Sequence, residues 1–202
     1  MSLILSGSDG LSDVDGSAST PAIRGTDANT GMFFPAADTI AFAEGGTEVM
    51  RIDSGGRVTM PLQPSCVAYL TTAQSISSAT VTKINLNVTG YDTASNFNTS
   101  TNRFTAPIAG YYLAMAAVQI DNGGVEVHCG IYLNGGSSAS AGLPDTWNQS
   151  GLGNTTGSGD TGWKNCILKL NANDYLELYT FQTGATRNCS ATRTTLSVRL
   201  IG

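Results

Sequence analysis

The sequence predicts an all-β protein in which a C-terminal antiparallel β-sandwich follows a segment of short strands and loops. Only 12% of the 202 residues are charged and 24 are glycine, a composition that favours short strands and turns over helices. Apolar and polar side chains alternate in several short runs, which is the period of a half-buried strand. No helical pattern separates these runs, and such spacing is typical of antiparallel sandwiches.

The N-terminal part of the chain ends near Pro61 and Pro64. It opens with a turn-rich, acidic stretch at 6–20. Short strands are then expected at 39–43, 47–53 and 57–60, joined by turns at EGG and SGG. Pieces of this length are too short to build a core, because an isolated hairpin is marginal in water. We therefore expect residues 1–62 to need partners, most simply copies of the same segment.

Longer strands are expected in the second part of the chain, residues 63–202. They lie at 66–70, 80–88, 103–120, 125–133, 166–170, 175–181 and 195–201. A stretch rich in Gly, Ser, Asn and Thr, from 134 to 162, is expected to be a loop.

The strand at 111–120 is apolar on both of its faces. One face carries Tyr111, Leu113, Met115 and Ala117, and the other carries Tyr112, Ala114, Ala116, Val118 and Ile120. A strand of a soluble sheet usually has one apolar face and one polar face. Both faces of this strand are therefore expected to be covered.

Composition limits the partners of the chain. The net charge is −5, the isoelectric point is near 4.6, and the Lys and Arg residues are scattered singly, which argues against nucleic acid. No apolar run is long enough for a membrane-spanning helix, and the N-terminus lacks the pattern of a signal peptide. We expect no membrane insertion and no cofactor.

The four cysteines have spacings that match neither a zinc site nor a thioredoxin motif. Cys129 is in step with apolar residues of its strand, so it is expected to be buried. We expect Cys66, Cys129, Cys166 and Cys189 to be free thiols, with Cys189 reacting first because its surroundings are loop-like.

Catalytic and metal-binding patterns are weak. The single histidine, His128, has no Gly-x-Ser-x-Gly nucleophile motif to serve. Carboxylate pairs for glycan hydrolysis could be drawn from Asp145, Asp160 and Asp174, but a chain with 15 acidic residues offers many such pairs. The calcium-like run of Asp9, Asp13 and Asp15 has the wrong spacing and no closing Glu, so these residues are read as turn residues. We expect neither an enzyme nor a metal site.

The expected loop at 134–162 is the best candidate for ligand binding because it is the longest loop and contains Trp147, with Trp163 directly after it. A loop tryptophan can stack on a sugar ring while nearby polar side chains bind its hydroxyl groups. The candidate residues are Trp147, Asp145, Asn148 and Gln149. The alternative is that the tryptophans fold back and pin the loop to the sandwich. We expect this for Trp163, and both readings stay open for Trp147.

The segment FNTSTNRFTAPIAGYY resembles the signature of the C1q/tumour-necrosis-factor-like jelly roll. The matching positions are Phe97, Thr101, Phe104, Thr105, Ala106, Pro107, Gly110 and Tyr112. Later matches follow in the family's order at IYLNGG, 166–181 and 195–202, although Ala172 and Asn173 stand where a glycine is usual.

This resemblance implies a jelly-roll head at 63–202 and a homotrimer. It places 111–120 on an inner sheet, with one face on the other sheet and one face on neighbouring subunits. The strand at 175–181 is expected to be a second inner strand. The implied interface residues are Tyr111, Leu113, Met115, Tyr175, Tyr179 and Phe181.

Residues 3–59 resemble a segment that recurs in phage tail-fibre and related virion proteins. The two resemblances together imply a trimeric fibre in the virion, on the tail or the capsid, that is assembled in the host cytoplasm. Residues 1–62 would be the shaft or attachment segment that contacts another virion protein. The head would bind a host cell-surface glycan or protein. The alternatives are a purely structural decoration protein or head fibre and, less favoured by the sequence, a glycan-degrading tailspike.

Overall fold

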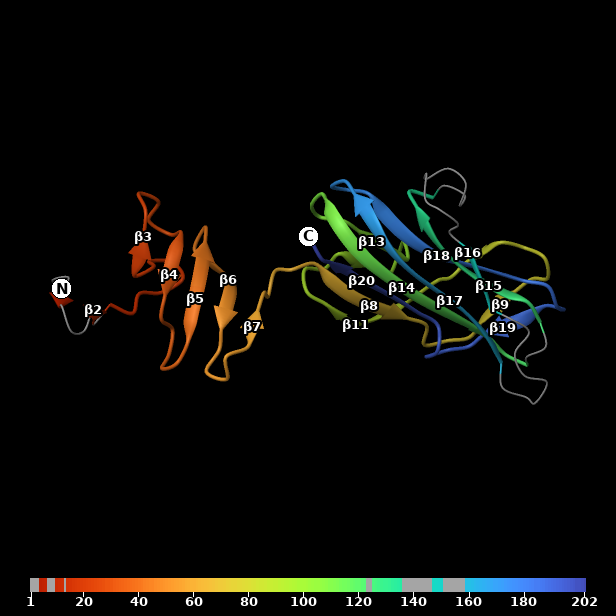
Figure 1. Ribbon diagram of the computed structural model, residues 1–202. Helices are drawn as coiled ribbons and strands as arrows, with labels where there is room; N and C mark the ends of the chain where they lie inside the picture. Colours follow the sequence, from red (N-terminus) through yellow and green to blue (C-terminus); the bar gives the residue numbers. More distant parts are fainter. Residues whose placement is uncertain (1–3, 7–9, 13, 123–124, 136–146, 151–158) are drawn as a thin grey trace. The chain divides into compact units, whose positions relative to one another are not determined.

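The computed structural model describes the chain except for residues 1–3, 7–9, 13, 123–124, 136–146 and 151–158. It divides into two compact units, Met1–Leu62 and Gln63–Gly202 (Figure 1). Every regular element of the described residues is a β-strand. Among these residues there is no helix of the length and apolarity needed to cross a membrane.

The N-terminal unit contains a small five-stranded antiparallel sheet. Its strands, in spatial order, are β3 (Ile23–Arg24), β4 (Gly31–Phe33), β5 (Ile40–Glu44), β6 (Thr47–Ile52) and β7 (Val58–Thr59). A separate hairpin pairs β1 (Ile4–Ser6) with β2 (Gly10–Ser12). The predicted strands at 39–43, 47–53 and 57–60 correspond to β5, β6 and β7. The turn between β5 and β6 uses Gly45 and Gly46, both with positive φ, which glycine adopts at little cost.

The first sheet of the C-terminal unit has seven strands. Six follow the order β11 (Val88–Asp92), β8 (Ser65–Tyr69), β20 (Thr195–Leu200), β14 (Gly110–Ile120), β19 (Arg187–Cys189) and β9 (Gln74–Ile76). The seventh, β17 (Asp160–Leu170), pairs with β14 along its whole length. The two long strands therefore make up one flank of this sheet.

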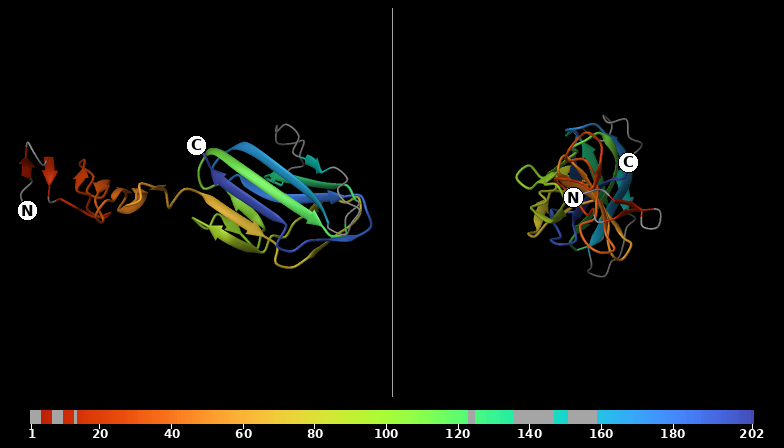
Figure 2. Two further views of the ribbon diagram at one scale, coloured as in Figure 1. Left: turned by 60° about the horizontal axis from the view of Figure 1, so that its bottom comes forward. Right: turned by 90° about the vertical axis from the view of Figure 1, so that its left-hand side faces the viewer.

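The second sheet has six strands. Five follow the order β12 (Phe97–Asn98), β13 (Arg103–Thr105), β18 (Tyr175–Gln182), β15 (Val127–Leu133) and β16 (Trp147–Ser150). The sixth, β10 (Thr82–Lys83), also pairs with β18. Figure 2 shows the two sheets as the layers of a sandwich.

The core lies between these layers. Tyr112, Val118 and Ile120 of β14 are fully buried, as are Leu176 and Leu178 of β18. The Tyr112 ring meets Phe104 edge-on with centroids 5.7 Å apart, and its hydroxyl donates to the Ile108 carbonyl at 2.8 Å. The predicted all-β sandwich is confirmed.

The predicted strand at 80–88 is only partly correct. Ile84 and Leu86 are buried, as the alternation predicts, but the ladder is interrupted between β10 and β11. The Gln74 side chain replaces a neighbouring strand here: its oxygen accepts from the Asn85 N–H at 2.8 Å, and its amide donates to the Lys83 carbonyl at 2.7 Å. A side chain that supplies these bonds removes the need for a paired backbone.

All four cysteines are free in the structure, but the expected order of reactivity is wrong. Cys189 lies in β19, fully buried, with its sulfur 3.0 Å from the Thr194 hydroxyl. Burial raises the pKa of Cys189 to about 11 and that of Cys66 and Cys129 to about 12. Cys166 is only half-buried and is the most accessible of the four.

Candidate functional site

The outer face of the β14–β17 strand pair carries four of the large apolar side chains that are exposed in the described residues of the C-terminal unit. We call it the β14–β17 face; it consists of Tyr111, Leu113, Met115, Ala117, Trp163 and Ile167. The register sets Leu113 opposite Ile167 and Ala117 opposite Trp163. The side chains of Ile167, Trp163, Tyr111 and Met115 are 62%, 55%, 52% and 42% exposed. The two strands that present these residues run side by side in Figure 1.

This face is large enough to matter energetically. Its two half-exposed aromatic rings present roughly 200 Å², and Met115 with Ile167 add about as much. Full coverage of roughly 400 Å² would contribute about 10 kcal/mol per subunit, before the entropic cost of association. Polar residues lie within it and beside it: Asn165 lies opposite Met115, Lys169 lies opposite Tyr111, and Arg199 lies opposite Leu113. Protein interfaces commonly combine apolar and polar surface in this way.

The structure brings together three of the six predicted interface residues. Tyr111, Leu113 and Met115 lie on the β14–β17 face, while the alternate residues of β14 fill the core. The other three, Tyr175, Tyr179 and Phe181, belong to β18. The expectation that 175–181 is a second strand of the same sheet is wrong, because β18 lies in the six-stranded sheet between β13 and β15. Alternation identified the two faces of this strand but not the layer to which it belongs.

The aromatic residues of β18 have partners within the chain. Tyr179 stacks on Tyr132 of β15, with centroids 4.1 Å apart and planes 19° apart. Arg103 lies over the Tyr175 ring at 4.1 Å, and Phe181 meets His128 edge-on at 5.3 Å.

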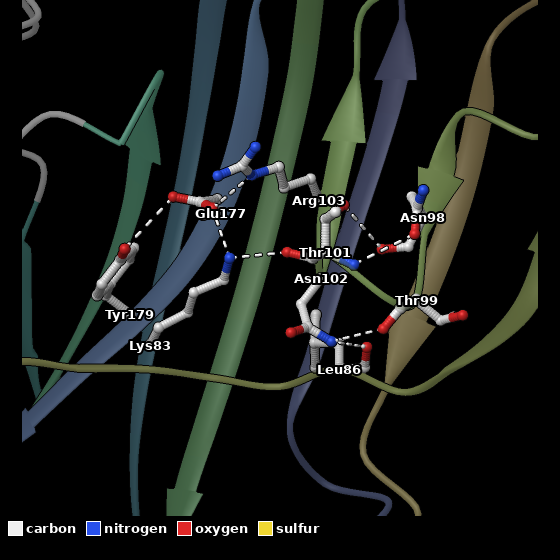
Figure 3. A network of polar contacts seen from close by, with 9 residues as sticks. All are labelled: Lys83, Leu86, Asn98, Thr99, Thr101, Asn102, Arg103, Glu177 and Tyr179. Atoms are coloured by element: carbon white, nitrogen blue, oxygen red, sulfur yellow. Dashed lines mark hydrogen bonds and ion pairs between the residues drawn. The ribbon is translucent and has the colours of Figure 1, made fainter.

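A buried carboxylate organises this second outer face (Figure 3). Glu177 of β18 is 2% exposed, and its Oε1 accepts from Lys83 Nζ and from Arg103 Nε, the latter at 2.8 Å. The Tyr179 hydroxyl donates to Oε2 at 3.3 Å, and Lys83 also donates to the Thr101 carbonyl at 2.7 Å. One carboxylate thereby ties β10 and β13 to β18.

The pKa of Glu177 lies below its ordinary value. Burial acts to raise the pKa, but the hydrogen bonds and charges of Lys83 and Arg103 together outweigh burial. The carboxylate is therefore ionised at neutral pH and compensated by two cations. This arrangement is a structural anchor, and sequence reasoning did not identify it. The sequence feature that could have indicated this anchor is the charge of Glu177 among the aromatic residues that alternate along β18.

The expectation that Trp163 pins a loop to the sandwich is wrong. It lies within β17, because that strand begins at Asp160 rather than at 166. The early part of β17 was hidden by Gly162, whose position faces the core so closely that a Cβ there would lie 3.1 Å from the Cys129 nitrogen. A glycine and polar neighbours conceal the alternation that places Trp163 on the outer face.

The candidate receptor-binding residues are also placed differently from the expectation. Trp147, Asn148 and Gln149 lie in β16, an edge strand whose register pairs them with Gly130, Cys129 and His128. The prediction that 134–162 is one continuous loop is therefore wrong at these residues. These residues form a strand because they pair with β15. The sequence WNQS has no apolar alternation that would predict a strand. Asp145 lies outside the described residues.

The three carboxylates considered for catalysis have separate surroundings. Asp160 is buried and accepts from the Val125 N–H at 2.7 Å. Asp174 closes a turn: hydrogen bonds from the Asn134 side chain, at 2.8 Å, and from the Asn171 N–H, at 2.7 Å, lower its pKa. Asp145 lies outside the described residues.

Other candidate groups likewise form no reactive cluster in the described part of the chain. His128 Nε2 is 2.8 Å from Glu126 Oε1. Asp15 is exposed, whereas Asp9 and Asp13 lie outside the described residues. Within the described residues, no group of three or more His, Cys, Asp or Glu side chains is placed to hold a metal ion.

Comparison with solved structures agrees with this geometry. The globular domain of zebrafish complement 1qA protein is similar to the chain, with 14% identity and a TM-score of 0.51, over 69% of this chain and 98% of that one. Murine APRIL at pH 5.0 is similar with 11% identity and a TM-score of 0.51, over 69% of this chain and 99% of that one. The chain matches no protein-family model and no curated protein. The sandwich has the C1q/TNF-like jelly-roll fold.

Proposed function

We propose that the chain is a homotrimeric, non-enzymatic fibre protein of a bacteriophage virion, whose C1q-like head binds a host cell-surface glycan or protein. The observation that carries the proposal is the exposed β14–β17 face, which is apolar except at Asn165 and lies on a sheet whose inner side already forms the core. A surface of this kind marks a site of protein association. The resemblance of residues 3–59 to phage fibre segments supports the place in the virion.

A second copy of the chain is the partner that fits this face best. In a homotrimer, each head would cover the Met115 and Ile167 side chains of a neighbour. The same residues would be buried in every subunit, as closed symmetric assemblies require. The resemblance to C1q/TNF-like heads supports three copies rather than two.

The receptor site is proposed at the β16 edge of the six-stranded sheet. Trp147, Asn148 and Gln149 follow one another there, with Asp145 just before them in the sequence. An aromatic contact with a sugar ring contributes about 1 kcal/mol, so a single site would be weak. Three sites on one trimer would raise the overall affinity through effective concentration.

The proposal is tested by locating the protein and measuring its binding. Antibodies to the full chain should label fibres of virions in electron micrographs, and the purified chain should bind host bacteria. Trp147→Ala should reduce cell binding without changing the mass of the assembly. Tyr91→Ala is the control, because it removes an aromatic side chain that is 50% exposed on β11.

Each alternative gives a different result. Fibre labelling without binding to host cells would replace the receptor-binding part with a purely structural role. Loss of viscosity of a host polysaccharide during incubation would indicate a tailspike enzyme. Absence of label on virions would contradict the proposal as a whole.

A further inference from the structure

The five-stranded sheet of the N-terminal unit carries an apolar face built from two cross-strand rows. We call it the N-terminal apolar face. The first row pairs Ile23 with Met32, Met32 with Phe42, and Phe42 with Met50. The second pairs Ile40 with Ile52, and Ile52 with Val58. Side chains directly opposite on neighbouring strands share one face, so the seven residues form one surface.

The two faces of this sheet differ in how the chain covers them. On the opposite face, Phe33, Ala41 and Ala43 are buried at 4%, 0% and 4% exposure and pack with Ala18. On the N-terminal apolar face, Val58 is 57% exposed and Ile23 is 41% exposed. Phe42 and Ile40 are each 36% exposed. The unit thus buries one face with its own residues and exposes the more apolar one.

Charged residues lie outside the two rows of this face: Glu44 follows Ile40 and Phe42 on the same side of β5, at the end of the strand. Neither cross-strand row contains a charged residue. The charges of β6 and of the turn after it are paired within the chain: Arg51 with Glu48 at 2.6 Å and Arg57 with Asp53 at 2.8 Å. Two copies can therefore bring these faces together without desolvating an unpaired charge on either row.

The size of the face distinguishes between two kinds of occupant. Its exposed apolar area is roughly 400 Å², because Val58, Ile23, Phe42 and Ile40 are 36–57% exposed and Met32, Met50 and Ile52 are partly exposed. A stable complex between independent proteins buries about 800 Å² on each partner. This face is too small to hold a separate protein alone, but it suffices between copies that are already tethered, because a tether raises their effective concentration.

We propose that the N-terminal apolar face packs against the same face of the other copies in an assembly that the heads hold together. The inference rests on the proposed self-association of the heads. It gives the N-terminal unit the second hydrophobic layer that its single sheet lacks. Contacts with another virion protein would then involve other parts of residues 1–62.

Hydrogen exchange of the full chain tests this contact. The mass of each protein is measured first, by sedimentation equilibrium. In the wild type, the amides of β4, β5 and β6 should exchange at least about tenfold more slowly than in a chain whose heads are dissociated by Met115→Lys with Ile167→Lys. Phe42→Lys should remove this protection and leave the mass unchanged. Thr59→Lys, on the opposite face, should retain the protection.

Cysteine cross-linking keeps the test decisive if Phe42→Lys unfolds the unit. In a Cys166→Ser background, Val58→Cys should give disulfide-linked chains under mild oxidation, whereas Thr59→Cys should give few. A monomeric wild type would show that the proposed assembly, and this inference with it, fails. An oligomeric wild type with neither β4–β6 protection nor Val58→Cys cross-links would overturn this inference alone.

Discussion

The two sheets of the head expose outer faces that look alike in sequence and differ in structure. On β14, the outward set is Tyr111, Leu113, Met115 and Ala117; on β18, it is Tyr175, Glu177, Tyr179 and Phe181. Both sets contain large side chains at alternate positions. The β18 set is satisfied within the chain by ring contacts and ion pairs, whereas the β14 set continues into the exposed Trp163 and Ile167 of β17.

The charge within each set explains the difference. Glu177 requires cations when it is buried, and Lys83 and Arg103 are brought over β18 to supply them. These long side chains, together with Tyr132, cover the aromatic residues around it. The β14 set contains no charge, and among the described residues Tyr111 and Met115 stay 52% and 42% exposed. In this molecule, the outward-facing set without a charge is the one that is left exposed.

The largest effect is expected from charges placed on the β14–β17 face. The double variant Met115→Lys with Ile167→Lys should convert the assembly to monomers, because ammonium groups in a desolvated interface cost several kcal/mol per subunit. Sedimentation measures the change. Val81→Lys is the matched control, since Val81 is 48% exposed just before β10. If the double variant keeps the wild-type mass, this face is not the contact between subunits.

A smaller effect, on stability alone, is expected from a substitution on the outer face of β18. Glu177→Gln should weaken the links from β10 and β13 to β18 and lower the free energy of unfolding by about 1–3 kcal/mol, without changing the mass. Denaturant titration at neutral pH measures this. Glu126→Gln, at the more exposed pair with His128, should cost less than about 1 kcal/mol. Loss of assembly in Glu177→Gln would contradict the division of roles between the two faces.

The same variant should change the response to acid. Because the pKa of Glu177 is lowered in the folded protein, its contribution to stability is present above the ordinary carboxyl pKa, near 4.3. The contribution is lost as the pH falls through the lowered value. The gap in stability between wild type and Glu177→Gln should therefore narrow below about pH 4. A gap that stays constant with pH would show that the loss in the variant comes from packing.

The smallest effect is expected from Tyr179→Phe. This change removes the hydroxyl that donates to Glu177 at 3.3 Å but leaves the ring that stacks on Tyr132. The free energy of unfolding should fall by no more than about 1 kcal/mol, since one long hydrogen bond to a well-compensated carboxylate is lost. Thermal melting at neutral pH measures the change, and a loss of several kcal/mol would mean that the hydroxyl, rather than the ring, holds this face together.

Much of the fold was predictable because it depends on local alternation. The alternate residues of β14 separate into a core set and an outward set, and the same pattern placed Ile84 and Leu86 inside. Strand boundaries in the N-terminal unit followed from glycine turns. These features need only the period of the strand and the chemistry of a turn.

The remaining features depend on contacts between distant residues. Ladder pairing with β15 makes β16 a strand although its sequence is polar, and pairing with β14 extends β17 back past Gly162 to Asp160. The layer that contains β18 is set by topology, which alternation along one strand does not encode. For the same reason, Cys189 was expected in a loop and lies buried in β19.

Sedimentation equilibrium of the wild-type full chain at micromolar concentration tests the central claim most directly, namely that the β14–β17 face is covered by other copies of the chain. The account predicts a single species of about 63 kDa, which is three chains of 20.9 kDa. A species of 20.9 kDa that persists across the concentration range would contradict it, because the face would then remain exposed to water.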